Sequence, residues 1–226
     1  MKSLNSSRAT NGKFPGERPI LYYITDRKQL AGCPLTNKIK RAISCGVDFI
    51  QIREKDLPDK ALFELACKAV SLARNSKSKI IVNGRADIAL AAGAHGVHLP
   101  ASALKISDLR SWLPASFLIG ASTHSAKEAY LAVSSGADYV LLGPVFRTES
   151  KAAFGPPLGL VRFKQACLSL HAPVIGLGGI RAGSAGSVLE AGAAGIAGIS
   201  LFQNEKEFAL LCKNLQLVGD IRRCKN

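Results

Sequence analysis

Three polar side chains follow one apolar run of the sequence at alternate positions: Gln51, Arg53 and Lys55. In an extended strand alternate side chains point to the same side, so this spacing groups one amide with two cations. Two cations on the inner face of a buried strand are costly unless an anion binds to them. We therefore expect an anion site here, with an internal ion pair to Glu54 or Asp87 as the alternative.

Two positions near the C-terminal end of the chain are suited to binding a phosphate. Gly178 and Gly179 follow one apolar run, and Ile199 and Ser200 follow the next, each ahead of a segment expected to be helical. Glycine lets backbone N–H groups approach a ligand closely, and the N-terminus of a helix favours negative charge. A single Gly-Gly pair is usually only a tight turn, but two such positions together favour a phosphate site.

Two further segments carry groups that could act on an anion or a proton. The stretch after Phe146 contains Thr148, Ser150 and Lys151 and then becomes rich in Gly and Pro. It is either a loop that closes over a ligand or an ordinary surface loop. His124 follows another apolar run. Histidine side chains in general titrate near neutral pH, so a histidine at this position is a candidate acid or base. A lone histidine at the start of a helix is, however, more often a cap or a packed residue.

A repeated pattern indicates the elements that would position these residues. Four segments share a small residue, a glycine suited to ending a helix and then an apolar strand, and four more apolar runs fall between them. Strands that read as continuous apolar runs belong in a parallel sheet covered on both faces. Eight such units predict a single-domain (β/α)₈ barrel, a TIM barrel, with an open doubly wound sheet as the alternative. The active site would then lie at the C-terminal ends of the strands.

The predicted strands are the repeats at 45–50, 92–97, 135–140 and 191–196 and the runs at 21–24, 79–82, 117–120 and 173–176. Helices are predicted over 58–75, 125–135 and 204–217, among others. Residues 1–18 are basic and lack an apolar core, so we expect a flexible arm ahead of a barrel over 19–226. An organelle-targeting role for this arm has only weak support.

Composition limits the kinds of partner. The net charge of +14 is spread along the chain without a recognition helix or a stacking-aromatic motif, so we expect no nucleic acid. A basic field also suits an anionic small molecule. Six cysteines without a C-x-x-C pair predict reduced thiols of a cytoplasmic protein and no zinc site. No apolar run is long enough to cross a membrane, and a homo-oligomer is compatible with the sequence.

Taken together, the motifs resemble the family of thiamine phosphate synthases and thiazole tautomerases. Gln-x-Arg-x-Lys at 51–55, Gly-Pro-x-Phe-x-Thr-x-Ser-Lys at 143–151 and the late Gly-Gly pair occur in order, and the similarity runs from about residue 20 to 215. The resemblance implies a TIM barrel of thiamine biosynthesis that binds a small phosphorylated thiazole. Together with their positions, it implies substrate contacts from Gln51, Arg53, Lys55, Asn83, Ser122, Thr148, Ser150 and Lys151, and phosphate contacts from Gly178, Gly179, Ile199 and Ser200.

Two positions distinguish the branches of this family. Synthases join a pyrimidine pyrophosphate to thiazole phosphate with magnesium, and aspartates at the positions of Gly84 and Ala103 hold the metal. The tautomerase branch is more similar at 83–90 and at 99–100, and it has a catalytic histidine at the position of His124. The resemblance therefore implies a metal-independent thiazole tautomerase without a cofactor. In this reading His124 moves a proton from the ring carbon that bears the carboxylate.

Two other functions remain open. The segment 143–151 is synthase-like and keeps Thr148, Ser150 and Lys151, so a thiamine phosphate synthase that uses magnesium is the first alternative. The second is a barrel without catalysis that binds thiamine intermediates or has a regulatory role. His124 beside a phosphate site argues against this second alternative.

Overall fold

The computed structural model describes residues 14–16, 18–30, 32–101, 105–148 and 156–223. Three of the residues discussed above, Ala103, Ser150 and Lys151, lie outside these ranges, as does most of the predicted N-terminal arm. None of the helices in the described ranges is long and apolar enough to cross a membrane.

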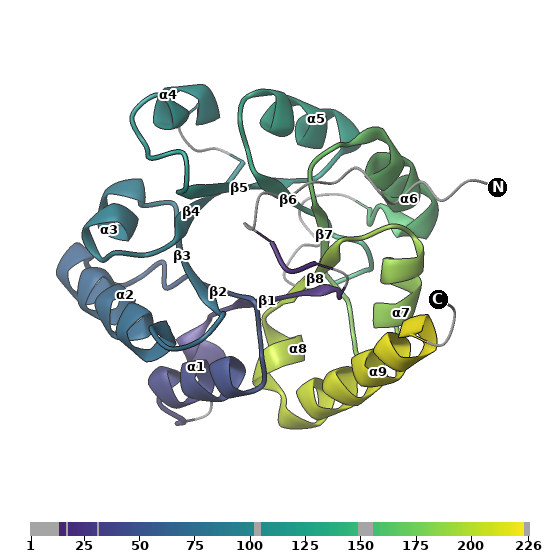
Figure 1. Cartoon of the computed structure of the whole chain (residues 1–226), viewed down its shortest axis with the longest axis horizontal. Coiled ribbons are helices and arrows are strands. Elements are labelled where there is room, and N and C mark those ends of the chain that lie inside the picture. The colour runs from purple at the N-terminus through teal and green to yellow at the C-terminus, as the bar shows by residue number, and fades with distance from the viewer. Residues whose placement is uncertain (1–13, 17, 31, 102–104, 149–155, 224–226) are drawn as a thin grey trace.

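Eight parallel strands close into one barrel, in which each strand pairs with the next and β8 pairs with β1 (Figure 1). The strands are β1 Ile20–Ile24, β2 Phe49–Ile52, β3 Lys79–Asn83, β4 Gly96–Leu99, β5 Leu118–Thr123, β6 Tyr139–Leu142, β7 Val174–Leu177 and β8 Gly195–Gly198. This order confirms the predicted TIM barrel and rules out the open doubly wound sheet.

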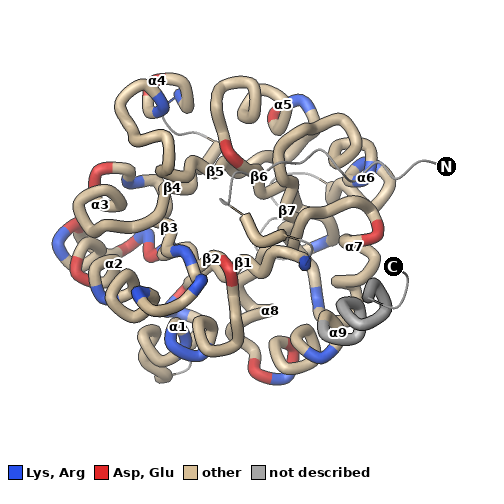
Figure 2. The backbone as a smooth tube through the Cα atoms, viewed as in Figure 1, with Lys and Arg blue, Asp and Glu red and all other residues tan. Residues whose placement is uncertain are grey.

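Helices surround the barrel on its outside (Figure 1). They are a 3₁₀ turn, η1 Arg27–Gln29, and the α-helices α1 Leu35–Ser44, α2 Asp59–Ala73, α3 Ala86–Ala91, α4 Ile106–Arg110, α5 Ala126–Ser134, α6 Gly159–Ser169, α7 Ala185–Glu190, α8 Ser200–Gln203 and α9 Glu205–Arg223. The helices predicted at 58–75 and 125–135 are confirmed as α2 and α5. Lys and Arg occur on helices on several sides of the barrel, among them α1, α2, α4, α5, α6 and α9 (Figure 2).

The strands divide the apolar core into an outer and an inner part. Because side chains alternate along a strand, Leu21 and Tyr23 of β1 belong to the outer part, whereas Tyr22 and Ile24 belong to the inner part. The inner part consists of Ile20, Tyr22, Ile24, Phe49, Ile81, Leu118, Tyr139, Leu141, Ile175 and Ala197. The interior is therefore packed, and a ligand is expected at the strand ends.

Contacts near the N-terminal end of the barrel tie the start of β2 to the start of β1. The Arg18 guanidinium forms an ion pair with Asp48 at 2.5 Å. Asp48 Oδ2 also accepts a hydrogen bond from the backbone N–H of Leu21 at 2.9 Å. Phe14 packs nearby on the inner core, with its ring centroid 5.8 Å from that of Phe49 and 6.1 Å from that of Tyr139.

Candidate active site

A row of polar side chains crosses four adjacent strands near their C-terminal ends. Gln51 Nε2 on β2 donates a hydrogen bond to Asn83 Oδ1 on β3 at 2.9 Å. Asn83 is the register partner of His98 on β4, and His98 Nε2 lies 2.8 Å from Ser122 Oγ on β5. The structure thus brings together Gln51, Asn83 and Ser122, as predicted from the sequence, and adds His98 between them.

Two atoms of this row are buried and have no hydrogen-bond partner among the described residues. They are Gln51 Oε1 and His98 Nδ1, and each residue is only 1% exposed. Because the Gln51 amide nitrogen donates to Asn83, its oxygen is free to accept a hydrogen bond. Leaving a buried polar atom unpaired costs about 1–3 kcal/mol, so these atoms indicate a place for a polar ligand.

His98 is held in its neutral form. Burial, aided by the nearby positive charge of Arg53, lowers the pKa of His98 to about 3. Tyr22 and Tyr139 pack around the imidazole, with ring centroids 6.2 and 5.8 Å away, and their hydroxyls lie 2.9 Å apart. Burial also raises the pKa of both phenols, which stay protonated. At neutral pH this part of the barrel therefore offers uncharged hydrogen-bonding groups.

Arg53 follows β2 at the mouth of the barrel and is partly buried. Its backbone N–H donates a hydrogen bond to Thr25 Oγ1 at 3.0 Å, which fixes it beside the end of β1. Arg53 is two residues after Gln51, so in an extended segment its side chain starts on the same side as that of Gln51, at one end of the polar row. Lys55, two residues further on, is exposed.

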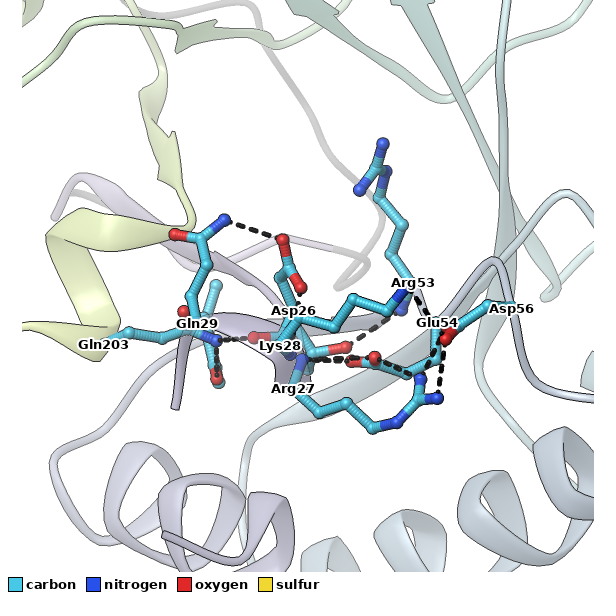
Figure 3. Close-up of polar contacts among 10 residues, drawn as sticks. Asp26, Arg27, Lys28, Gln29, Arg53, Glu54, Asp56 and Gln203 are labelled. Carbon is cyan, nitrogen blue, oxygen red and sulfur yellow. Dashed lines mark hydrogen bonds and ion pairs between the residues drawn. The ribbon is translucent and has the colours of Figure 1, made fainter. Parts of the chain in front are cut away.

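Both carboxylates considered as ion-pair partners for Arg53 are bound elsewhere. Glu54 pairs with Arg27 at 3.0 Å, and Asp87 pairs with Arg85 at 2.6 Å. Figure 3 shows the Arg53 side chain directed away from the group around Arg27 and Glu54. No carboxylate of the described residues forms an ion pair with Arg53. A partly buried cation without such a partner favours an anion site over the internal ion pair.

The Gly-Gly pair lies at the end of β7, against the loop that follows β6. Phe146 N–H donates to the carbonyl oxygen of Gly178 at 3.0 Å, and Gly178 and Gly179 have φ of 96° and 67°. A Cβ on Gly179 would lie 2.6 Å from the carbonyl oxygen of Arg147 and 2.7 Å from that of Phe146. Only glycine fits here, because the backbone of the loop after β6 passes too close to the end of β7 to leave room for a side chain.

The remaining predicted phosphate contacts lie beside this pair, on the next strand. Ile199 follows β8 and packs against the inner core, and Ser200 is the exposed first residue of α8. Because β8 pairs with β7, both residues are on the same side of the mouth as Gly178 and Gly179. Thr148 ends the described part of the loop after β6.

His124 is the predicted catalytic residue, and it lies just beyond β5 with one-quarter of its side chain exposed. Its backbone N–H donates to Glu128 Oε2 at 2.8 Å, and its Nδ1 lies 3.4 Å from the same oxygen. The adjacent Ser125 caps α5 by accepting from the Glu128 N–H. These contacts are those of a residue packed at the start of a helix.

Comparison with known proteins identifies the family. The chain matches the thiamine monophosphate synthase family over residues 21–202. It belongs to that family. It is 43% identical to a putative thiamine-phosphate synthase of Geobacter sulfurreducens, over 80% of this chain and 84% of that protein. It is 38% identical to the thiamine-phosphate synthase of Methanoculleus marisnigri, over 87% and 93% of the two chains. A solved thiamine phosphate pyrophosphorylase from Pyrococcus furiosus has a TM-score of 0.79 and 33% identity, and the match covers 88% and 96% of the two chains.

Within the thiamine monophosphate synthase family, the prediction of a tautomerase, and with it of an isomerase, is wrong. The relatives named above are thiamine-phosphate synthases, which are transferases, and nothing in these comparisons singles out the tautomerase branch. The tautomerase prediction rests on Gly84 and Ala103, on local similarity at 83–90 and 99–100 and on His124, and these features are outweighed by the synthase-like segment 143–151 and by the relatives. Two positions are weak evidence when similarity to the synthases extends over most of the barrel.

Membership of this family implies a magnesium ion. Whether this chain could hold the ion depends on the ligands that the side chains at the mouth of the barrel offer. Gly84 has φ 72°, and among the described residues only Pro100 Cδ, at 3.9 Å, lies within 4 Å of the place of a Cβ, so glycine here leaves space and offers no side-chain oxygen. The oxygen of Asn83 already accepts from Gln51. The described residues contain no group of three or more His, Cys, Asp or Glu that could hold a metal. These side chains therefore do not fit a carboxylate-held magnesium ion.

Proposed function

We propose that this protein is a thiamine-phosphate synthase, a transferase that joins hydroxymethylpyrimidine pyrophosphate to thiazole phosphate. One observation carries the proposal: Gln51 and His98 each have an unpaired buried atom, and Arg53, two residues after Gln51, has no ion pair among the described residues. A polar heterocycle attached to an anionic group would satisfy both features. The names of the relatives support the same reaction.

The polar row is proposed to bind the pyrimidine. Gln51 Oε1 can accept a hydrogen bond from an amino group on the ring, and its amide nitrogen is fixed by Asn83. His98, neutral and oriented by Ser122, supplies a hydrogen bond without adding charge. Binding the ring here orients its methylene carbon toward the mouth of the barrel.

Arg53 is proposed to bind the pyrophosphate, with the exposed Lys55 as a second cation. A planar guanidinium can donate two parallel hydrogen bonds to phosphate oxygens. In the reaction the thiazole nitrogen forms a bond to the methylene carbon, the carbon–oxygen bond to pyrophosphate breaks, and pyrophosphate leaves with the bonding electrons. Arg53 would stabilise the negative charge that develops on this leaving group.

The opposite side of the mouth is proposed to bind the phosphate of the thiazole. Gly178 and Gly179 follow β7, Ile199 follows β8 and Ser200 begins α8, and backbone N–H groups at these positions usually bind the phosphate in this fold. Thr148 is the last described residue before the gap in the loop after β6, and Phe146 of this loop contacts Gly178. The two substrates would therefore bind side by side, each through its own anionic group.

A binding experiment tests this two-substrate arrangement. Inorganic pyrophosphate and thiazole phosphate are titrated separately by calorimetry, and each is then titrated into protein saturated with the other. We expect both to bind, with affinities that change by less than about threefold in the presence of the other ligand, because their sites are distinct. Mutually exclusive binding would indicate a single phosphate site and would contradict the proposal.

A further inference from the structure

Glu54, the residue next to Arg53, is buried and fully engaged by one neighbour. It is 4% exposed, and the backbone N–H of Arg27 lies 3.2 and 3.1 Å from its two oxygens. The Arg27 guanidinium donates a further hydrogen bond to Glu54 Oε2 at 3.0 Å and binds Asp56 with both of its terminal nitrogens, at 2.7 and 2.8 Å. Figure 3 shows these contacts as one cluster behind Arg53.

A second set of contacts fixes the backbone at the end of β2 to β1. Thr25 is fully buried, and its N–H donates to the carbonyl oxygen of Gln51 at 2.9 Å. Its Oγ1 accepts the N–H of Arg53 at 3.0 Å. The loop after β1 is itself attached to α8, because Gln203 Nε2 donates to the carbonyl oxygen of Asp26 at 3.0 Å. Residues 51–54 are thus held in one conformation against two neighbouring elements.

The direction of the Arg53 side chain follows from these contacts. Successive side chains of an extended segment point to opposite sides, so holding Glu54 on the outer side directs Arg53 to the mouth. Figure 3 shows this opposition, with the Arg53 guanidinium directed away from Arg27 and Glu54. Glu54 is a poor candidate for binding substrate itself, because its oxygens are occupied and its charge would repel an anion.

We propose that Glu54, held by Arg27, is a positioning residue that orients Arg53 toward the anionic group of the substrate. Thr25 has the same role through the backbone of Arg53. The identity of that anion as a pyrophosphate rests on the proposed function. The positioning itself rests on the hydrogen bonds around Glu54 and Thr25.

The test compares two buried carboxylates that link the same pair of strands at opposite ends. Glu54→Gln removes the charge behind Arg53, and Asp48→Asn removes the charge that pairs with Arg18 at the N-terminal end. The two carboxylates are similarly buried, 4% and 5% exposed. Both variants should therefore be less stable than the wild-type protein, so a loss of stability alone does not distinguish them.

Affinity for inorganic pyrophosphate does distinguish them. We expect Glu54→Gln to raise the Kd for pyrophosphate about tenfold and to leave the Kd for thiazole phosphate within about twofold, because only Arg53 loses its orientation. Asp48→Asn should leave both values within about twofold of wild type. Thr25→Val, which keeps the size of the side chain but removes the acceptor for the Arg53 N–H, should repeat the selective loss. If Glu54→Gln does not fold, Thr25→Val alone tests the positioning role.

Two results would overturn the positioning role. One is wild-type pyrophosphate affinity in Glu54→Gln and Thr25→Val, and the other is an equal loss of affinity for both ligands, which would indicate general damage to the barrel. In either case the proposed function would stand as long as the wild-type protein binds pyrophosphate and thiazole phosphate together. Failure of the wild-type protein to bind pyrophosphate would instead contradict the proposed function.

Discussion

Replacing Arg53 with alanine is expected to lower kcat/KM for the pyrimidine pyrophosphate by about 10²–10³-fold. This is the usual effect of removing a hydrogen-bond donor to a charge that develops in the transition state. No described carboxylate pairs with this arginine, and it lies beside the buried polar row, so an anion bound there would lose its strongest partner. Steady-state kinetics with each substrate varied in turn measure the effect. Arg53→Lys keeps the charge but not the paired donors, so we expect it to recover only part of the activity.

Arg74→Ala is the matched control for Arg53→Ala. Arg74 is an exposed arginine at the C-terminal end of α2, where the chain leads into the start of β3 at the opposite end of the barrel, and its removal changes the net charge by the same amount. We expect its kinetics to match those of the wild-type protein. Wild-type kinetics for Arg53→Ala, or an equal loss in both variants, would mean that Arg53 does not bind the anion.

Gly179→Ala is expected to abolish measurable turnover and to lower the free energy of unfolding by about 2–4 kcal/mol. The added Cβ would meet two carbonyl oxygens of the loop after β6 at 2.6 and 2.7 Å, in a residue whose φ is 67°. The loop must move away from β7, which removes the close approach at the proposed phosphate site. Urea denaturation gives the loss of stability, and the turnover assay gives the loss of function.

Gly46→Ala is the control for Gly179→Ala, because it introduces a similar backbone strain without a steric clash. Gly46 has a similar φ of 75°, but no atom of the residues that the structure describes lies within 4 Å of the position that a Cβ would occupy. Gly46→Ala should therefore lower the free energy of unfolding by only about 1–2 kcal/mol, the penalty for a non-glycine residue in a left-handed conformation. We also expect it to leave turnover unchanged, since it precedes β2 at the N-terminal end of the barrel. If Gly179→Ala were as stable and as active as Gly46→Ala, the glycine would not be needed for the contact with the loop.

The fold could be predicted because the repeated unit is local. A glycine that ends a helix, followed by an apolar run, indicates each strand by short-range rules, and parallel pairing then fixes the positions of the strand ends. Gln51 and Ser122 follow predicted strands and so were expected at the mouth, whereas Asn83 was expected there from the family resemblance. Residues from different strands meet at the mouth simply because the barrel closes.

Interactions that depend on register and side-chain direction could not be predicted. His98 reads as the end of an apolar strand, and only its pairing opposite Asn83 and next to Ser122 indicates a role in the site. The pairing of Glu54 with Arg27 joins residues 27 positions apart, and no local pattern distinguishes it from a pair with Arg53. The sequence therefore left the choice between an anion site and an internal ion pair open.

The choice of reaction failed for a different reason. Gly84 and Ala103 remove two expected metal ligands, and this loss, together with the local similarity at 83–90 and 99–100 and with His124, led to the tautomerase prediction. Losing ligands shows how a chain differs from its relatives, but the reaction depends on the whole set of substrate contacts. Similarity to synthases over most of the chain outweighs these two positions.

Turnover of the two proposed substrates tests the central claim most directly. Purified protein is incubated with hydroxymethylpyrimidine pyrophosphate and thiazole phosphate, once with magnesium and once with EDTA, and the products are separated by chromatography. We predict that the wild-type protein forms one pyrophosphate for each thiamine phosphate. Arg53→Ala should form both products about 10²–10³ times more slowly. Folded wild-type protein that forms no thiamine phosphate under either condition would contradict the assignment as a synthase.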